Sequence, residues 1–355
     1  MFGAYRYILA LLVMTGHHLQ LQGSSSLVEL SIGGKSIAVF GFYLVSGYLM
    51  TKTLQENYPY SRRGIGRFLR NRFLRIFPGY WAALVLSILV MASYRDPATL
   101  SRYDLYWPNG AGVWLRNILV LWPYPPASWL LVPPSWSLKV EIFYYLLFAL
   151  GISRTRKSTW IWVGASTAIL CFLLARGASF EQRYFTVWGA SLPFSLGAIF
   201  FHFRDARVFR KADEYVALSA MALLLLDIGL GHRFEPGFRG TWAFYFALFL
   251  NFVALIGFSQ LERGSSSRLG RILVRWDQKL GDLTYPIFLL HWVAAILVSH
   301  FLTSDRLPLS LGLFVLCFIV THLLSYLFVR LLDRPLFRIR LTRHSESVIA
   351  ARGVE

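Results

Sequence analysis

Long runs of apolar residues alternate with short polar segments along the whole chain. Ten of these runs have about the 17–25 residues that a helix needs to cross the hydrocarbon core of a bilayer. They cover residues 4–20, 34–54, 77–93, 136–152, 159–175, 184–203, 215–230, 241–260, 283–301 and 309–331. A backbone in lipid must satisfy its own hydrogen bonds, which favours helices. The pattern predicts an all-α integral membrane protein, a bundle of about ten transmembrane helices.

Composition and charge refine this prediction. The chain is 56% apolar and 15% charged, and its formal net charge of +18 raises the question of nucleic-acid binding. Basic residues concentrate in alternate loops, however, with 26 of the 36 in one set: the N-terminus, 52–76, 153–158, 204–214, 262–282 and the tail from 330. The positive-inside rule places that set in the cytoplasm. We therefore expect a multi-pass protein of the inner (cytoplasmic) membrane with both termini cytoplasmic, contacts with membrane lipids and no nucleic-acid partner.

The cysteines, the first apolar run and the C-terminal residues give three further expectations. Cys171 and Cys317 fall in different predicted spans, so no disulfide framework is predicted. The first apolar run lacks a clean small-x-small cleavage site, and we expect it to be retained rather than removed as a signal peptide. Residues 1–340 are predicted to form one transmembrane domain, and residues 341–355 a disordered cytoplasmic tail.

Arg6 and His17 stand out in the first span because ionisable groups within a membrane usually mark a functional site. They are eleven residues apart, almost three full turns, so both side chains point the same way. The axial rise separates them by about 16 Å, with Arg6 at the inner mouth and His17 half-way across. The alternative is a topology charge beside a structural, hydrogen-bonded histidine. His18 lies off this face.

Four arginines precede the third span in "RFLRNRFLRIFPGYW". Arg67 with Arg70, and Arg72 with Arg75, form two i, i+3 pairs on a predicted short helix that ends at Pro78. Guanidinium groups bind phosphate oxygens in a bidentate fork, so the cluster suits a phosphate-bearing ligand. Anionic lipid headgroups are the alternative ligand.

Two later spans carry ionisable groups at depth. Glu141 in "PPSWSLKVEIFYY" must be paired or neutral there, and suits either proton transfer or a structural ion pair. Lys139 faces elsewhere on the helix. His291 in "GDLTYPIFLLHWV" reaches the depth of His17 and, with Tyr285, is predicted to line the same cavity or to make a polar interhelical contact.

The segment 94–135 is rich in Trp, Tyr and Pro. Aromatic side chains of this kind anchor a protein at the membrane interface. A platform on which sugar rings stack is the second interpretation, and the two are compatible.

Six blocks in order resemble one family, the membrane-bound acyltransferase-3 proteins, which are bacterial carbohydrate O-acyltransferases. Arg6 and His17 match its Arg-x(10)-His signature, and Arg72 and Arg75 match its Arg-x-x-Arg motif. "VFGFYLVSGYLM", "PSWSLKVEIFYY", "LTYPIFLLH" and "LDRP" are similar to its other blocks. One departure is that many members have Gly-Val-Asp where this chain has Ala38-Val39-Phe40, which removes an acidic group and any acceptor contact it makes.

The resemblance implies an enzyme that moves an acyl group, usually acetyl, from cytoplasmic acyl-CoA to a hydroxyl of a surface or exported carbohydrate. The acceptor is a polysaccharide or a lipid-linked oligosaccharide, and acetyl-CoA or another short acyl-CoA is the donor substrate, with no permanent cofactor and no metal site. The expected roles are as follows: catalysis by His17, Glu141 and His291; binding of the CoA by Arg6, Arg72 and Arg75; contact with the substrate by Trp136, Ser137 and Tyr285.

Two routes and two rival functions stay open. His17 acts either as general base for direct attack by the hydroxyl, or as a nucleophile that carries an acyl-imidazole. A transporter or flippase of lipid-linked sugars would also have buried charges, although its usual paired halves are not evident here. An acyltransferase acting on a small molecule or a lipid would keep the chemistry and change the acceptor.

Overall fold

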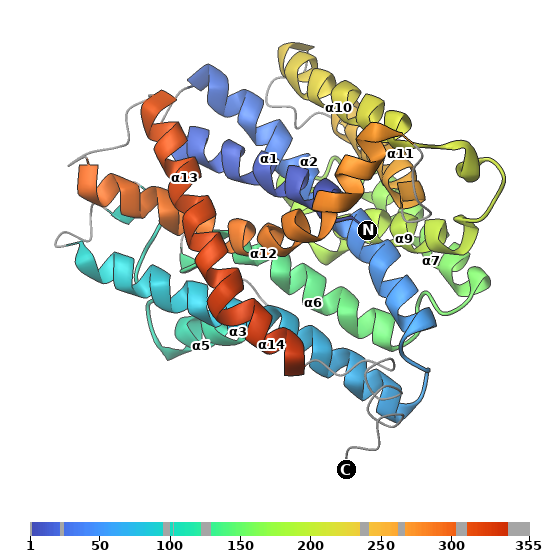
Figure 1. Cartoon of the computed structure of the whole chain (residues 1–355), viewed down its shortest axis with the longest axis horizontal. Helices are drawn as coiled ribbons and strands as arrows, with labels where there is room; N and C mark the ends of the chain where they lie inside the picture. The colour runs from blue at the N-terminus through green and yellow to red at the C-terminus, as the bar shows by residue number, and fades with distance from the viewer. Residues whose placement is uncertain are drawn as a thin grey trace.

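The computed structural model describes residues 2–21, 25–94, 100–101, 103–121, 129–234, 241–261, 267–302 and 311–339. Over these residues the chain is helical, without a β-strand. Figure 1 shows α12 crossing the middle of the molecule, and α1 packs against both α2 and α12. The tail predicted for residues 341–355 lies outside the described ranges.

The described residues form a series of α-helices along the chain. They are α1 (Gly3–Leu21), α2 (Ser25–Glu56), α3 (Arg62–Ser93), α5 (Ala111–Leu119), α6 (Trp136–Ala149), α7 (Arg156–Ala175), α8 (Phe180–Tyr184), α9 (Val187–Phe203), α10 (Glu214–Phe234), α11 (Thr241–Gln260), α12 (Arg268–Leu302), α13 (Leu311–Phe328) and α14 (Arg334–Ile339). Among the described residues, two 3₁₀ turns, η2 (Pro133–Ser135) and η3 (Phe209–Lys211), and one π-helical segment, η5 (Val329–Asp333), lie between these helices.

Each predicted apolar run falls on one of these helices. Six helical segments in the described part of the chain are long and apolar enough to cross a membrane by themselves: Gly34–Glu56, Arg62–Ser93, Arg156–Ala175, Trp242–Gln260, Arg268–Leu302 and Leu311–Leu336. The all-helical, multi-pass class is therefore confirmed. The number of ten spans and the cytoplasmic position of the termini stay predictions.

Pro78 does not end the helix that carries the arginines, so that prediction was wrong. α3 begins after Ser61, whose Oγ accepts a hydrogen bond from the N–H of Gly64 at 3.1 Å, and it continues to Ser93. A proline inside a helix removes one backbone donor and disturbs one turn. Membrane helices accept this loss because neighbouring groups satisfy the freed carbonyl, and α12 likewise continues through Pro286.

Small residues let the central helices approach closely. A Cβ on Gly47 of α2 would lie 2.1 Å from the carbonyl oxygen of Phe194, and one on Gly197 of α9 would lie 2.0 Å from that of Leu44. Any larger side chain at either glycine would force the two helices apart. The α2–α9 contact is therefore a backbone-to-backbone contact of the kind common between membrane helices.

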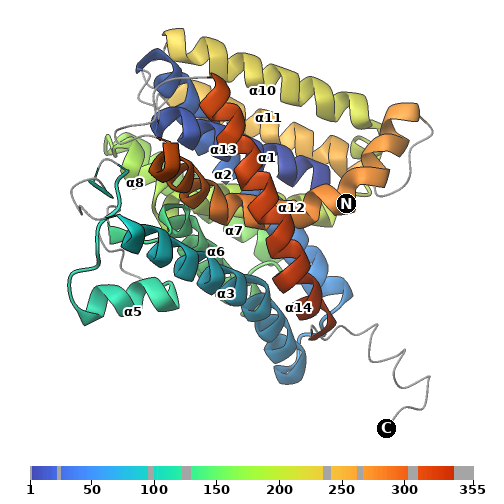
Figure 2. The same ribbon diagram turned by 60° about the vertical axis from the view of Figure 1, so that its left-hand side comes forward.

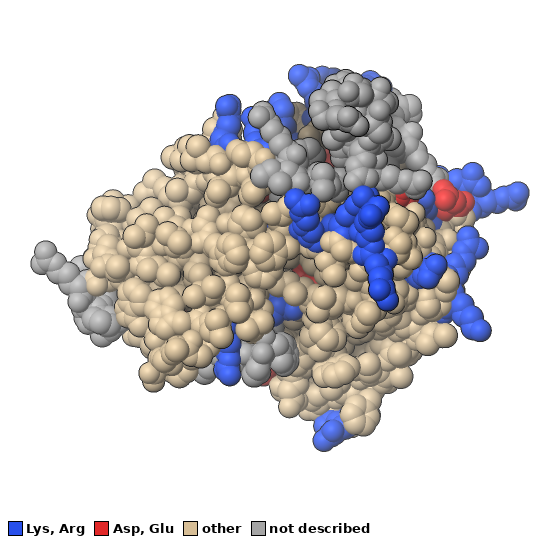
Figure 3. All heavy atoms as spheres, turned by 90° about the horizontal axis from the view of Figure 1, so that it is seen from below, with Lys and Arg blue, Asp and Glu red and all other residues tan. Residues whose placement is uncertain are grey.

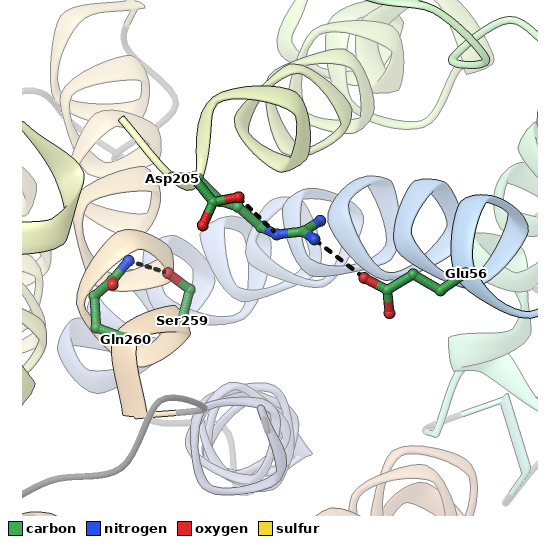
Figure 4. A network of polar contacts seen from close by, with 5 residues as sticks. Glu56, Asp205, Ser259 and Gln260 are labelled. Atoms are coloured by element: carbon green, nitrogen blue, oxygen red, sulfur yellow. Dashed lines mark hydrogen bonds and ion pairs between the residues drawn. The ribbon is translucent and has the colours of Figure 1, made fainter. Parts of the chain in front are cut away.

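The loops that carry most basic residues meet at one end of the bundle. Nη2 of Arg204, after α9, donates to Oε1 of Glu56 at the end of α2 across 3.1 Å (Figure 4). A hydrogen bond from Ser267 to Glu214 joins the start of α12 to the start of α10. In Figure 3 most Lys and Arg atoms lie on one side of the view, opposite a broad area of other residues. This clustering at one end agrees with the alternation of charged loops along the sequence.

Figure 2 shows α5 alongside α3, and Asn117 fixes this position. Its backbone carbonyl accepts a hydrogen bond from the hydroxyl of Tyr80 at 2.6 Å. Its side chain donates to the carbonyl of Trp129 and accepts from the N–H of Leu131, both at 3.0 Å. Asn117 thereby ties α3 to the segment that leads into α6. The segment 94–135, predicted as an aromatic belt or platform, is described only in part.

Candidate active site: two adjoining cavities

A cavity of about 890 Å³ lies between α1, α2, α3, α6 and α12. Its size falls in the range of pockets that hold drug-sized ligands and cofactors, about 300–1,000 Å³. Its polar lining residues are Arg6, Ser46, Thr53, Asn71, Arg72, Arg75, Ser137, Glu141, Asp282 and Thr284, with the hydroxyl-bearing rings of Tyr43, Tyr58, Tyr145 and Tyr285. We call this space the arginine cavity. All three arginines predicted to bind a ligand line it.

Arg6 is placed by the contact between the first turn of α1 and the first half of α12. Oδ1 of Asp277 accepts a hydrogen bond from the backbone N–H of Ala4 at 3.0 Å, which satisfies one of the free donors of the helix start. Nε of Arg6 donates to the carbonyl of Phe2 at 3.3 Å. The Asp277 carboxylate at the positive end of α1 also stabilises the helix dipole.

Two glycines make room for this arginine. A Cβ on Gly281 would lie 2.9 Å from Cα of Gly3 and 3.1 Å from Nη2 of Arg6. A Cβ on Gly3 would lie 1.7 Å from the carbonyl oxygen of Asp277. The close approach of α1 and α12 therefore requires glycine at both positions, and it sets where the guanidinium of Arg6 lies.

Arg72 and Arg75 extend from α3 over aromatic rings. The Cζ atom of Arg72 lies 5.9 Å from the ring centre of Tyr145, and that of Arg75 lies 6.0 Å from the ring centre of Tyr285. Nε of Arg72 is buried and makes no hydrogen bond to any residue that the structure describes. Cation–π contacts hold a guanidinium without neutralising it. Both groups thus remain suited to an anionic ligand.

Glu141 lies in the same cavity and accepts two hydrogen bonds. Its Oε1 accepts from the hydroxyl of Ser46 at 2.9 Å and from the hydroxyl of Tyr145 at 2.5 Å. Neither Ser46 nor Tyr145 was predicted as a site residue. Ser46 is a hydroxyl inside an apolar run, and Tyr145 follows Glu141 by four residues on one helix face, so the sequence did contain a signal for each.

A second cavity of about 220 Å³ adjoins the first. It is lined by His17 and Gln20 of α1, by Lys35 and Ser36 of α2, by Trp136 of α6 and by Phe180, Glu181, Tyr184 and Phe185 around α8, with Val13 and Pro134. We call this space the histidine cavity. Val39 and Phe288 line both cavities and therefore lie where the two meet; we refer to this pair as the wall.

His17 is bonded to His291 on α12. Nδ1 of His17 lies 2.8 Å from Nε2 of His291, and the rings are 2° from parallel. Nδ1 of His291 lies 2.9 Å from the carbonyl oxygen of Ile287, which accepts only, so this nitrogen carries a hydrogen. In the neutral ring Nε2 of His291 then accepts, and Nδ1 of His17 donates. Nε2 of His17 is left with its lone pair, in a ring that lines the histidine cavity.

The side chain of His18 bonds to the backbone of His291. Its Nε2 lies 3.0 Å from the carbonyl oxygen of His291, to which it donates, and the side chain is 1% exposed. It lines neither cavity. The ring of Trp292 packs edge-on against His17, with 4.9 Å between ring centres. These contacts support the histidine pair and hold the His17 ring in one orientation.

The structure thus divides the predicted site between two spaces. The arginine cavity contains six of the predicted residues: Arg6, Arg72, Arg75, Ser137, Glu141 and Tyr285. His17 and Trp136 line the histidine cavity, and His291 lies behind His17. The expectation that Tyr285 shares the cavity of His17 was wrong, because Tyr285 reaches α3 and donates to the carbonyl of Ile76 at 2.7 Å.

Phe40 explains the departure from the Gly-Val-Asp pattern. Its ring is 1% exposed and packs against Tyr184 and Phe244, with ring centres 5.5 and 5.0 Å away. It lines neither cavity. An acidic group here would be buried among aromatic rings, so this chain has replaced it with packing.

Comparison with known proteins defines the class. A family model described as an acyltransferase domain matches residues 4–330. The chain is 24% identical over 322 residues to Acyltransferase MdmB of Streptomyces mycarofaciens, covering 81% of this chain and 76% of that protein. It is 23% identical over 314 residues to the putative membrane-bound transacylase BcsY of Komagataeibacter xylinus, covering 83% of this chain and 75% of that protein. No solved structure matches the chain significantly.

The helical bundle and the family match together define a multi-pass membrane acyltransferase, an enzyme that transfers acyl groups other than aminoacyl groups. The chain belongs to the acyltransferase-3 family.

Proposed function

We propose that this enzyme transfers an acetyl or other short acyl group from cytoplasmic acyl-CoA to a hydroxyl of a surface or exported carbohydrate. The observation that carries the proposal is the position of His17. Its Nδ1 is held by His291 at 2.8 Å, and its ring lies in a cavity that shares a wall with the arginine cavity.

The donor is assigned to the arginine cavity. Acyl-CoA has phosphates at one end and a thioester at the other, joined by a long flexible arm. Arg6, Arg72 and Arg75 supply the planar donors that bind phosphate oxygens well. The arm then extends toward Val39 and Phe288, which brings the thioester next to the histidine cavity.

The acceptor is assigned to the histidine cavity. Trp136 lies there with its ring centre 4.9 Å from that of Tyr184 and 4.6 Å from that of Phe185. Aromatic faces suit the apolar face of a sugar ring, and Lys35 and Glu181 suit its hydroxyl groups. The relatives' names speak of transacylase and acyltransferase activity and leave the acceptor open.

Two reaction routes use the same lone pair. In direct transfer, Nε2 of His17 takes the acceptor proton while the oxygen bonds to the thioester carbon; the C–S bond breaks, and the proton passes to the CoA sulfur. In the other route Nε2 bonds to the thioester carbon itself, the C–S bond breaks, and the ring proton of His17 goes to the leaving sulfur, so that CoA leaves as the thiol. The acyl-imidazole then gives its acyl group to the hydroxyl, whose proton returns to the His17 ring. In both, His291 stabilises the charge that develops on His17.

Glu141 acts on the donor side in this scheme. Its carboxylate, held by Ser46 and Tyr145, lines the same cavity as the arginines. Its negative charge in the same cavity helps to orient Arg72 and Arg75. Glu141 was expected to act in catalysis with His17 and His291; the donor-side role replaces that expectation in this proposal, because Glu141 and His17 line different cavities.

A reconstitution experiment tests the proposal. Purified protein in lipid discs is given acetyl-CoA labelled in the acetyl group, with glycan extracts from the source membrane. Label in the glycan without any ion gradient supports the enzyme, whereas movement of glycan across liposomes without CoA release supports a transporter. If a small molecule or a lipid carries the label instead, the reaction is as proposed and only the acceptor differs. A labelled protein adduct that His17→Ala removes would select the acyl-imidazole route.

A further inference from the structure

Phe288 borders both cavities, so an acyl group that moves from the donor to His17 has to pass its ring. It lies on α12, one turn before His291, and its ring is 8% exposed. The ring centre of Phe288 is 6.4 Å from that of His291 and 6.0 Å from that of Phe42. Phe42 lines the arginine cavity only, whereas Phe288 lines both.

Val39 completes the wall from α2. It is 5% exposed and, like Phe288, borders both cavities. A donor held by the arginines has its thioester on one side of this pair, and His17 lies on the other. The direct path of the acyl group to His17 therefore passes these two side chains.

We infer that Phe288, with Val39 opposite, is a gate between the donor and acceptor cavities and limits the size of the acyl group that passes. The inference rests on the proposed function. In the observed position the ring borders both cavities; rotation of the ring toward the arginine cavity widens the passage beside His17. A closed gate also keeps water in the histidine cavity from a bound thioester until the acyl group enters.

Size selection follows from the same geometry. The histidine cavity, about 220 Å³, must hold the acyl group together with the part of the acceptor that carries the hydroxyl. A short acyl group passes an aromatic ring that has turned aside, while a longer chain also needs the space that the ring itself occupies. Removal of the ring therefore enlarges the set of usable acyl groups.

A labelling experiment tests the gate without any catalysis. Ser36 lines the histidine cavity, so Ser36→Cys in a chain with Cys171→Ala and Cys317→Ala provides one reporter thiol. The reagent is sulfonatoethyl methanethiosulfonate, which is small, membrane-impermeant and anionic, and which the arginines attract. It is added to inside-out vesicles, where the basic loops face the reagent.

We expect Phe288→Ala to increase the labelling rate of the reporter at least tenfold. Phe42→Ala is the matched control, because it removes an identical ring from the arginine cavity alone and should leave the rate within twofold. Phe288→Leu, which keeps bulk, should give an intermediate rate and guards against misfolding. The inference would be overturned if the reporter reacted as fast in the chain that keeps Phe288 as in Phe288→Ala. It would also be overturned if neither Phe288 variant increased the labelling rate.

CoA release gives a second readout. With no acceptor present, water replaces the acceptor hydroxyl: its oxygen bonds to the thioester carbon, the C–S bond breaks, and the products are the carboxylic acid and the CoA thiol. Phe288→Ala should raise this release at least tenfold, and it should use butyryl- and hexanoyl-CoA as well as acetyl-CoA. An unchanged chain-length profile contradicts size selection. If Phe288 controls the labelling rate but the unaltered enzyme transfers no acyl group, the gate is supported and the proposed function is refuted.

Discussion

Nδ1 of His17 lies 2.8 Å from Nε2 of His291, although 274 residues separate them along the chain. The bond fixes which nitrogen of His17 can react, because His291 is itself oriented by the carbonyl of Ile287. A histidine that would be ambiguous alone thus has a defined free lone pair. This relationship generates the first prediction.

His291→Ala should lower the turnover number about 10²-fold with little change in KM for acyl-CoA, because the His17 ring loses the acceptor that orients it. His291→Gln should recover part of the loss, since an amide oxygen can accept the same hydrogen bond. The measurement is CoA release on membranes that contain the native acceptor. Equal activity of the Ala and Gln variants would show that the hydrogen bond is not what matters.

A substitution of Arg72 tests whether the cavity arginines bind acyl-CoA or serve only as topology charges. Arg72→Lys should raise KM for acyl-CoA roughly tenfold or more, because lysine loses the bidentate fork and the stacking on Tyr145. Arg70→Lys is the control on the same helix; its side chain is exposed and does not line the cavity. Similar KM values for the two variants would favour the anionic-lipid interpretation of this cluster.

Two substitutions of different severity test the role of Glu141 in the arginine cavity. Glu141→Gln keeps the shape of the side chain and removes the charge near Arg72 and Arg75, and it should lower the turnover number about tenfold or more. Ser46→Ala removes only one of the two hydrogen bonds to the carboxylate and leaves its charge in place, so it should have a smaller effect. The KM and turnover number of each variant, measured with acyl-CoA, check the order.

Gly281 should be intolerant of a side chain. Gly281→Ala places a Cβ 2.9 Å from Gly3 and 3.1 Å from Nη2 of Arg6, so both the melting temperature and the affinity for acyl-CoA should fall. Gly164→Ala in α7 is the control: a Cβ there meets nothing within 4 Å. Alanine is a better helix former by about 1 kcal/mol, so this variant should be neutral or slightly more stable.

The orientation of the bundle can be read from the two ends of α7, which are both exposed. In a chain without native cysteines, an impermeant thiol reagent on intact cells should label Arg176→Cys and leave Lys157→Cys unlabelled. Lysis should make both react. The reverse pattern would contradict the cytoplasmic position of the basic loops.

Much of the site could be predicted from residue spacing. Arg6, Arg72 and Arg75 were expected to bind one ligand together, and they line one cavity; Glu141, which was expected to act with His17, lines that cavity too. The partition into two cavities was not predictable, because the spacing of Arg6 and His17 along one helix does not show that Val39 and Phe288 come between their surroundings. Pro78 was misjudged for a related reason: helix propensity measured in water does not apply where lipid and neighbouring helices satisfy the backbone.

By itself the sequence determined the helices and the class of protein. Lipid gives a backbone no hydrogen-bond partners, so a long apolar run must satisfy its bonds within its own helix, and that requirement is local. Tertiary structure alone decided which side chains meet. Pairs such as His17 with His291 and Ser46 with Glu141 depend on how closely helices approach, which small residues such as Gly3 and Gly281 set through packing between segments far apart in the chain.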